Sequence, residues 1–394
     1  MSEPIVRIAA RGDGVTASGR YAALAAPGDL LHDDGSVEAG PNHQPPPCRH
    51  FPECGGCQLQ HVSDGAYRLY LQDRVAGALA QHGLATDIRA PHLSPANSRR
   101  RASLRALRTG QGVVIGFNAA RSTRVVDMRE CHILRPQLFG LVAPLRGLLG
   151  SLLPARRVAD VQLTGCDQGV DVAIKGIAAE GLAAAEALPA FGQTHRLARL
   201  SVDEGHGAEV RYEPEPATVT LSGVPVPLPI GAFLQATDDG EAALVAAVRS
   251  ACGGAAHTAD LFAGLGTFAL AIEGPVTAAE ASRDAVFALQ SAARQSGRAV
   301  AAEHRDLYRR PYDARELEAF DAVILDPPRA GAEEQVKQLS DSGVARIAYV
   351  SCNPATFARD AAILAAGGFR LEWARPVGQF RWSTHIELAV CFSR

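Results

Sequence analysis

Residues 257–273, HTADLFAGLGTFALAIE, decide the fold class of this 394-residue chain. The first residues predict a buried strand ending at Asp260, the glycines a tight turn, and the remainder a helix. Gly264 and Gly266 let the turn's backbone approach a ligand closely. Such a turn lies where open α/β sheets bind ligands. Strand and helix patterns alternate from here to residue 394, which is typical of a doubly wound parallel α/β domain.

The turn departs from the dinucleotide-binding fingerprint G-x-G-x-x-G, because Ala269 stands at the third glycine. Its D-x-F-x-G-x-G form runs through Asp260, Phe262, Gly264 and Gly266. In that form it resembles motif I of the class I S-adenosylmethionine-dependent methyltransferases. The resemblance implies a Rossmann-like domain that binds S-adenosylmethionine through these residues.

Two acids follow at the ends of the next predicted strands. Glu280 ends a strand in VTAAEAS, where a carboxylate can accept hydrogen bonds from ribose hydroxyls. Asp306, in EHRDLY, is expected on the adenine side. An ordinary βα turn without a ligand is the alternative. Acids at successive strand ends favour the cofactor site over it.

Two more strand ends carry reactive groups. FDAVILDPPRAG (320–331) ends a strand at Asp326, and AYVSCNPATFARD (348–360) ends the next beside Cys352. Because carboxyl ends of parallel strands meet at one edge, both side chains should face the glycine turn. QFRWSTHIELAV (379–390) adds His385 and Glu387 at a terminal strand.

A thiol and carboxylates beside a methyl sulfonium suit the methylation of carbon 5 of uracil. Carbon 5 of uracil is too weak a nucleophile to take a methyl group unaided. A thiolate that adds to carbon 6 delivers electron density to carbon 5, and a base then removes the carbon-5 proton so that the thiol is eliminated. A nearby arginine or helix terminus that lowers the thiol pKa would help.

Asp-Pro-Pro-Arg, Ser-Cys-Asn-Pro and His-Ile-Glu, in that order after the glycine turn, resemble the signatures of the RNA uracil-5-methyltransferase family. The resemblance implies that Cys352 is the nucleophile and Glu387 the base. It also implies that Gln235, in GAFLQAT, contacts cofactor and base, and that Asp326 lines the pocket. The expected product is 5-methyluridine in 23S ribosomal RNA, with transfer RNA as the alternative substrate.

A second set of cysteines lies far from this site in the sequence. Cys48, Cys54 and Cys57 form a tight group, and Cys131 offers a fourth thiol. Four thiolates suit either tetrahedral zinc or an iron–sulfur cluster, and their spacing alone does not choose. The run C-G-G-C-x-x-Q-H resembles the module of ribosomal-RNA uracil methyltransferases, which implies a [4Fe–4S] cluster with a structural role.

The remaining sequence predicts four parts. Residues 1–40 resemble a short TRAM-like β-barrel, residues 41–90 hold the iron–sulfur module and a helix over 64–84, residues 91–225 form a central α+β RNA-binding domain, and residues 226–394 form the methyltransferase domain. The resemblance supplies the TRAM and RNA-binding assignments. The Pro/Gly-rich stretch GVPVPLPIG (223–231) marks the last boundary.

The distribution of charge and the hydropathy of the chain indicate which binding partners to expect. The net charge is −3, yet residues 97–131 hold eight arginines against two acids. This stretch either follows an RNA backbone or is a solvated surface, and charge alone favours neither. Without a signal sequence or a long apolar stretch, we expect a cytoplasmic monomer with no membrane and no obligate protein partner. A stacked target uridine would have to be turned out of the RNA.

Three other functions are less favoured. An amino-group methyltransferase usually has an aromatic residue where Arg329 stands, and it has no need of Cys352. A non-catalytic iron–sulfur RNA-binding protein would tolerate loss of Cys352 and Glu387. A folate-dependent mechanism lacks a flavin fingerprint in the cofactor loop.

Overall fold

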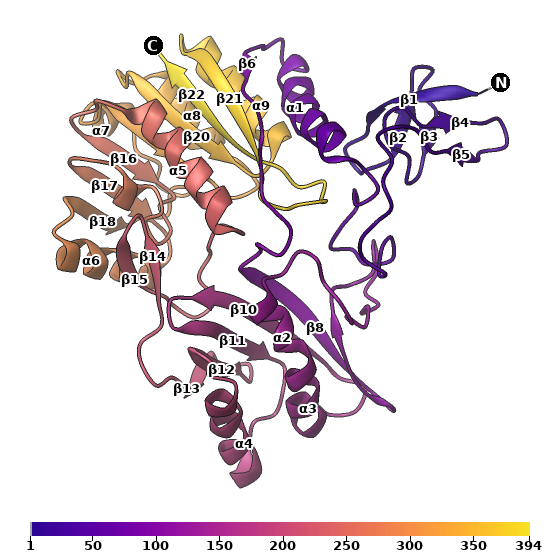
Figure 1. The fold of residues 1–394 in the computed structure, drawn as a ribbon. Coiled ribbons are helices and arrows are strands. Elements are labelled where there is room, and N and C mark those ends of the chain that lie inside the picture. The colour runs from indigo at the N-terminus through magenta and orange to yellow at the C-terminus, as the bar shows by residue number, and fades with distance from the viewer. Residues whose placement is uncertain (1) are drawn as a thin grey trace.

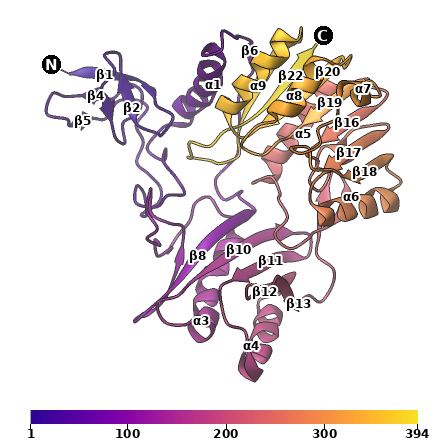
Figure 2. The ribbon, with the colours of Figure 1, turned by 180° about the vertical axis from the view of Figure 1, so that it is seen from behind.

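The computed structural model describes residues 2–394, which form four β-sheets (Figure 1). The N-terminal sheet lies at one end, the central domain lies below, and the C-terminal α/β domain lies beside both, as the reverse view also shows (Figure 2). No helix in residues 2–394 has the length and apolar character needed to cross a membrane.

The N-terminal sheet has five short antiparallel strands in the order β3-β2-β1-β4-β5. These are β1 (Glu3–Ile8), β2 (Gly14–Thr16), β3 (Tyr21–Ala22), β4 (Leu30–Leu31) and β5 (Val37–Glu38). Ile5, Ala22, Ala25 and Leu31 form its small core. A small β-rich domain was predicted here; its TRAM-like identity stays a prediction.

Helix α1 (Asp64–Ala80) begins at Ser63, whose side chain accepts a hydrogen bond from the Ala66 amide. Its buried face shares one hydrophobic core with the C-terminal domain and packs against α9 and β21. The short strands β6 (Asp87–Ile88) and β7 (His92–Leu93) pair with β21. The helix grouped by sequence with the cysteine module is therefore packed as part of the C-terminal domain.

The central domain is a six-stranded sheet in the order β13-β12-β11-β10-β8-β9, with helices packed on it. Only β11 and β12 pair in parallel, so the domain is α+β, as predicted. Its elements are β8 (Arg101–Thr109), β9 (Gly112–Gly116), α2 (Pro136–Gly140), α3 (Val142–Leu152), β10 (Val158–Cys166), β11 (Gly169–Lys175), α4 (Gly181–Thr194), β12 (Arg199–Asp203) and β13 (Ala208–Tyr212).

A hairpin, β14 (Thr218–Leu221) and β15 (Val224–Pro227), connects the central and C-terminal domains. Its apolar residues belong to the core of the C-terminal domain, and β15 packs against α6. The packing boundary therefore lies before the hairpin, a few residues upstream of the predicted boundary at 226.

The C-terminal domain is a nine-stranded sheet with the main order β18-β17-β16-β19-β20-β22-β21. The first five strands are parallel, and β22 lies antiparallel between β20 and β21. Its elements are α5 (Asp238–Cys252), β16 (Thr258–Leu261), β17 (Val276–Glu280), α6 (Arg283–Ser296), β18 (Val300–His304), α7 (Ala314–Leu317), β19 (Ala322–Leu325), α8 (Glu333–Ser340), β20 (Arg346–Ser351), α9 (Pro354–Ala366), β21 (Arg370–Gly378) and β22 (Glu387–Ser393).

One local prediction was wrong. The sequence after the glycine turn was expected to form a helix, but the structure has only a 3₁₀ turn, Ala269–Ala271. The physical reason is the short path to the next strand, because β17 begins at Val276 and leaves too few residues for a full α-helix.

Candidate active site

The carboxyl ends of the parallel strands open into one cavity of about 600 Å³, which we call the strand-end cavity. Eight of the ten residues predicted for cofactor and catalysis line it: Gln235, Phe262, Gly264, Glu280, Asp306, Asp326, Cys352 and Glu387. They come from the carboxyl ends of five parallel strands, from the start of β22 and from the connection before α5. The fold therefore brings together groups that are up to 152 residues apart in the sequence.

The two predicted residues outside the cavity lining, Asp260 and Gly266, support the turn from below. Asp260 is fully buried, and its Oδ2 accepts a hydrogen bond of 2.8 Å from the Ala269 amide. Burial raises the pKa of Asp260 to about 8, and the nearby Asp326 adds to the shift. Gly266 has φ +89°, and a Cβ there would lie 2.4 Å from a Leu289 methyl carbon. Both residues shape the turn instead of facing a ligand.

Glu280 ties the turn to the second strand. Its Oε2 accepts a hydrogen bond of 2.9 Å from the Gly264 amide, and its Oε1 accepts one of 2.7 Å from the Ser282 amide. Ser282 caps α6. The carboxylate is thus fixed in orientation at the cavity wall, where the predicted contact with a ribose is expected.

Two aromatic residues form part of the wall. Phe262 lies with φ +66°, an uncommon conformation for a bulky residue, and its ring is 5.5 Å from that of Tyr308. The Tyr308 hydroxyl donates to the Gly331 carbonyl. Sequence reasoning missed Tyr308, although its place two residues after the strand-end Asp306 was the available signal.

Cys352 follows β20 and precedes α9, at the rim where Asn353 caps the helix and Pro354 begins it. Burial raises the pKa of the Cys352 thiol to about 11, and the Glu387 and Asp326 carboxyls add to the shift. The Arg329 guanidinium acts in the opposite direction. The free protein therefore holds a thiol at neutral pH, with one cation placed to favour the thiolate.

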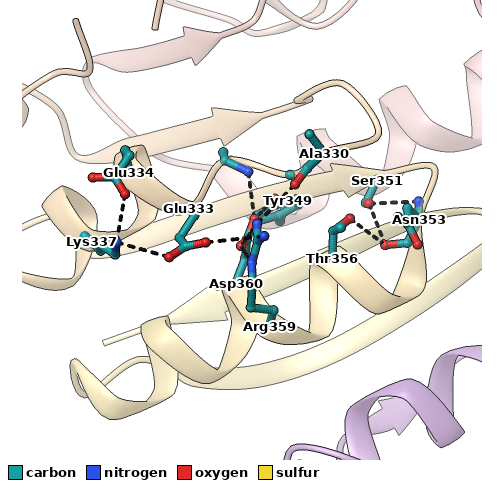
Figure 3. A network of polar contacts seen from close by, with 12 residues as sticks. Ala330, Glu333, Glu334, Lys337, Tyr349, Ser351, Asn353, Thr356, Arg359 and Asp360 are labelled. Carbon is teal, nitrogen blue, oxygen red and sulfur yellow. Dashed lines mark hydrogen bonds and ion pairs between the residues drawn. The ribbon is translucent and has the colours of Figure 1, made fainter. Parts of the chain in front are cut away.

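The loop that carries Arg329 is braced by α9. The Arg329 carbonyl accepts hydrogen bonds from the Asn353 Nδ2 and the Thr356 hydroxyl, both at 3.1 Å. One turn further on, Asp360 accepts from the Ala332 amide and from the Tyr349 hydroxyl (Figure 3). The same helix that begins beside the nucleophile thus holds the backbone of the loop that carries the neighbouring cation.

Glu387 is buried at the start of β22. Burial and the nearby Asp326 hold its pKa well above the ordinary range, while a hydrogen bond from Gln379 acts against the shift. Burial also raises the pKa of Asp326, to about 7. Two buried carboxyls with raised pKa values beside a thiol make a site suited to acid–base chemistry on a bound base.

The four cysteines predicted as ligands line a second, smaller cavity, the thiol cavity. Burial is the largest cause of the raised pKa at each of Cys48, Cys54, Cys57 and Cys131, and neighbouring sulfurs add to the shift at the first three. Among the described residues, no three histidines, cysteines or acids meet closely enough to hold a metal ion. Four soft donors around one cavity remain the donor set that an iron–sulfur cluster requires.

The strand order, the glycine turn and the cavity above it define a class I S-adenosylmethionine-dependent methyltransferase. A family model described as tRNA (Uracil-5-)-methyltransferase matches residues 259–394. An uncharacterized RNA methyltransferase of Zymomonas mobilis is 48% identical over 393 residues, with 99% of each chain covered. The chain belongs to the RNA (uracil-5-)-methyltransferase family, whose members transfer a methyl group from S-adenosylmethionine to RNA.

Two further comparisons bear on substrate and fold. The 23S rRNA (uracil(1939)-C(5))-methyltransferase RlmD of Chromohalobacter salexigens is 33% identical over 386 residues, covering 93% of this chain and 80% of that one. The structure of Pyrococcus abyssi tRNA (uracil-54, C5)-methyltransferase with S-adenosyl-L-homocysteine matches with a TM-score of 0.76 at 21% identity, covering 100% and 99% of the two chains. The second likeness shows the shared fold.

Proposed function

We propose that this protein methylates carbon 5 of a uridine in 23S ribosomal RNA through a covalent bond between the Cys352 sulfur and carbon 6 of the base. The observation that carries the proposal is the shared cavity. Cys352, Glu387 and Asp326 line the same 600 Å³ space as the glycine turn of the cofactor site. RlmD supports the ribosomal substrate through its 33% identity.

The cofactor would be held by the turn and by the strand ends beside it. Phe262, Gly264, Glu280 and Asp306 line that side of the cavity. The Gly264 amide is fixed by its bond to Glu280, so the turn is preorganised for a nucleoside. When bound, S-adenosylmethionine supplies an electrophilic methyl group and a sulfonium charge.

Cys352 supplies the nucleophile. Its sulfur, as a thiolate, forms a bond to carbon 6, and the electron pair of the C5–C6 double bond becomes available at carbon 5. Arg329 is the group that favours the thiolate, and the brace from α9 holds its loop in place. After carbon 5 has gained its methyl group, the carbon still carries the proton that must leave.

Glu387 is the base that removes this proton. The C5–H electrons then re-form the double bond, and the C6–S bond breaks to release Cys352. A carboxylate in a buried site is a stronger base than one in water, because burial disfavours its charge. The raised pKa of Glu387 therefore suits a group that must accept a proton from carbon.

Mass spectrometry of nucleosides tests the proposal. RNA from cells with and without the gene should differ in 5-methyluridine of 23S ribosomal RNA. Cys352→Ala should abolish transfer and retain S-adenosylmethionine binding, and Glu387→Gln should accumulate a protein–RNA adduct. Cys166→Ala is the matched control, because Cys166 is also half-buried, also has a pKa near 11, and lies outside the cavity. Turnover by Cys352→Ala would overturn the covalent mechanism.

Transfer RNA is the second candidate substrate. The family whose model matches is named for it, and the Pyrococcus abyssi relative is a tRNA (uracil-54, C5)-methyltransferase. Loss of 5-methyluridine from transfer RNA alone, with ribosomal RNA unchanged, would move the protein to that substrate and keep the mechanism.

The thiol cavity is proposed to hold a [4Fe–4S] cluster. Its wall combines the cysteine module with Phe117, Val126 and Met128 at the far edge of the central domain. Bound there, the cluster would cross-link two segments about seventy residues apart, which is a structural role. Purified protein should be brown and contain iron; a colourless protein rich in zinc would overturn this assignment.

The arginines of residues 97–131 other than the buried Arg100 are proposed to bind the RNA backbone. Arg101 lies over the ring of Phe233, with 5.4 Å between its Cζ and the ring centroid, and Phe233 lines the strand-end cavity. The central domain therefore reaches the mouth of the cavity, where a flipped uridine would enter. We propose a monomer that acts in the cytoplasm without an obligate protein partner.

A further inference from the structure

Cytosine poses a problem for the proposed chemistry. Its carbons 5 and 6 form the same kind of double bond as those of uracil, so a thiolate could activate either base. The two bases differ at carbon 4, where uracil has a carbonyl acceptor and cytosine an amino donor. To distinguish the two bases, the cavity needs a side chain that faces the carbon-4 substituent and can only donate a hydrogen bond to it.

We infer that Gln379 makes this protein specific for uridine, because it fixes the Gln235 amide with its NH₂ group toward the base. Gln379 is a positioning residue, and Gln235 is the group that contacts the substituent on carbon 4. The inference rests on the proposed function and deepens it. Gln379 is 1% exposed, follows β21, and lies outside the cavity lining.

The orientation of Gln379 follows from its partner. Its Oε1 lies 2.8 Å from the Ala236 backbone nitrogen. A backbone N–H can only donate, so the facing atom must be the amide oxygen, and Nε2 must point the other way. The backbone of Ala236 thus decides which end of the Gln379 amide faces Gln235.

The orientation of Gln235 follows in turn. The Gln379 Nε2 lies 2.7 Å from the Gln235 Oε1, and a donor there requires the Gln235 oxygen as acceptor. The Gln235 NH₂ group is left with no hydrogen-bond partner among the described residues, although the residue is 3% exposed and lines the cavity. Because Gln235 lines the cavity, this free donor is available to an acceptor on the ligand.

The position of Gln235 selects carbon 4 as its target. Cys352 lies close enough to Glu387 for their charges to interact, and Glu387 accepts a hydrogen bond from Gln379. Gln379 therefore adjoins both Glu387 and Gln235, which puts Gln235 on the Glu387 side of Cys352. With carbon 6 at Cys352 and carbon 5 at Glu387, as proposed above, the substituent on carbon 4 is the one nearest to Gln235. The Gln235 NH₂ group can donate a hydrogen bond to the uracil O4. It cannot bond to the cytosine amino group, because both groups are donors.

Two neighbouring features hold the pair in place. A Cβ on Gly240, in the first turn of α5, would lie 2.7 Å from the Gln379 Cβ, so the glycine leaves room for the side chain. Arg100 of the central domain donates to the Gln235 carbonyl at 3.0 Å. The backbone of Gln235 is therefore anchored from one side and its amide from the other.

The test compares two transcripts that carry the modified site of 23S ribosomal RNA, one with uridine and one with cytidine at the target. Gln379→Glu replaces the donor by a carboxylate oxygen, so the Gln235 amide should turn its NH₂ toward residue 379 and its oxygen toward the base. The uridine-to-cytidine ratio of kcat/KM should fall by about 10-fold to 100-fold, the usual cost of a mispaired buried polar group. Gln379→Met, which removes the contacts with Ala236, Gln235 and Glu387, should lower the ratio without reversing it.

Gln335→Met is the matched control. Gln335 is also 1% exposed, and its amide makes two hydrogen bonds, both to the backbone of Tyr312 and away from the cavity. It should leave the ratio unchanged even if it lowers stability. An unchanged ratio in both Gln379 variants, with a wild-type enzyme that rejects cytidine, would overturn the inference. Failure of the wild-type enzyme to methylate the uridine transcript would instead overturn the proposed function.

Discussion

Arg100→Met should strongly destabilise the contact between the central and C-terminal domains. The Arg100 side chain is 5% exposed and makes three contacts with the segment that begins α5. It donates to the Gln235 carbonyl, to Asp238 at 2.7 Å and to Glu241 at 2.5 Å. The substitution keeps the apolar stem and removes the charge.

The magnitude follows from the exposure of the partners. Asp238 is 56% exposed and also pairs with Arg135, so losing the Arg100–Asp238 ion pair lowers the stability only slightly. Glu241 is 11% exposed and would be left as a buried carboxylate without a cation. Breaking a buried pair on one side costs about 3–5 kcal/mol, and we expect a loss of this size.

Urea unfolding followed by tryptophan fluorescence measures the effect, because Trp373 lies in β21 of the C-terminal domain and Trp382 follows β21 and packs against Cys57 and Ile133. Arg105→Met is the control: Arg105 is 46% exposed and pairs with an exposed Asp160, so its loss should cost less than about 1 kcal/mol. Equal losses in the two variants would refute the reasoning.

The pH dependence of the stability of Arg100→Met provides a second test. Burial already raises the pKa of Glu241, and Arg100 is the group that lowers it. Without Arg100, the folded protein binds a proton at Glu241 more tightly than the unfolded chain does, so the variant loses stability as the pH rises above the ordinary glutamate range. Adding Glu241→Gln should recover much of the loss and flatten this dependence.

Three other predictions concern single groups. Arg329→Ala should raise the pKa of Cys352 further, so the rising limb of kcat/KM against pH should move to higher pH, while Arg329→Lys should move it less; an unmoved limb would contradict the role of the cation. Asp260→Asn should stabilise the protein more at pH 9 than at pH 5 in thermal unfolding, because the folded pKa near 8 lies above the unfolded value and stability is lost as the pH rises between them; equal shifts at both pH values would count against it. Cys57→Ser should lower the iron content from about four atoms per chain towards zero by elemental analysis; full retention would exclude Cys57 as a ligand.

Local sequence patterns predicted much of the C-terminal domain. The glycine turn, the strand-end acids and the S-C-N-P run each carry their meaning in a few adjacent residues, so the Rossmann-like fold and eight cavity residues were predicted before any contact was known. The helix expected after the turn was wrong, because helical composition was present but the chain had to reach β17 at once.

Contacts between distant segments were not predictable in this way. Gln379 was missed because nothing adjacent in sequence marks it; its role comes from contacts with Ala236 and Gln235, far along the chain. Tyr308 was missed although it follows the strand-end Asp306 by two residues, and its hydroxyl is held by the distant Gly331 carbonyl. The placement of α1 was likewise decided by its buried face, which found a partner in β21 and α9 instead of in the cysteine module.

The sequence by itself determined the class of fold, because the glycine turn and the strand-end residues depend on residue type at a fixed local spacing. Its resemblance to the RNA uracil-5-methyltransferase family supplied the proposed nucleophile, base and four thiols. Only the tertiary structure decided which groups share a cavity, how burial and neighbouring charge raise the pKa values of Cys352, Asp326 and Glu387, and which way the Gln235 amide faces. Those properties arise from desolvation and from hydrogen bonds between strands and loops remote in sequence, and they exist only when the chain is folded.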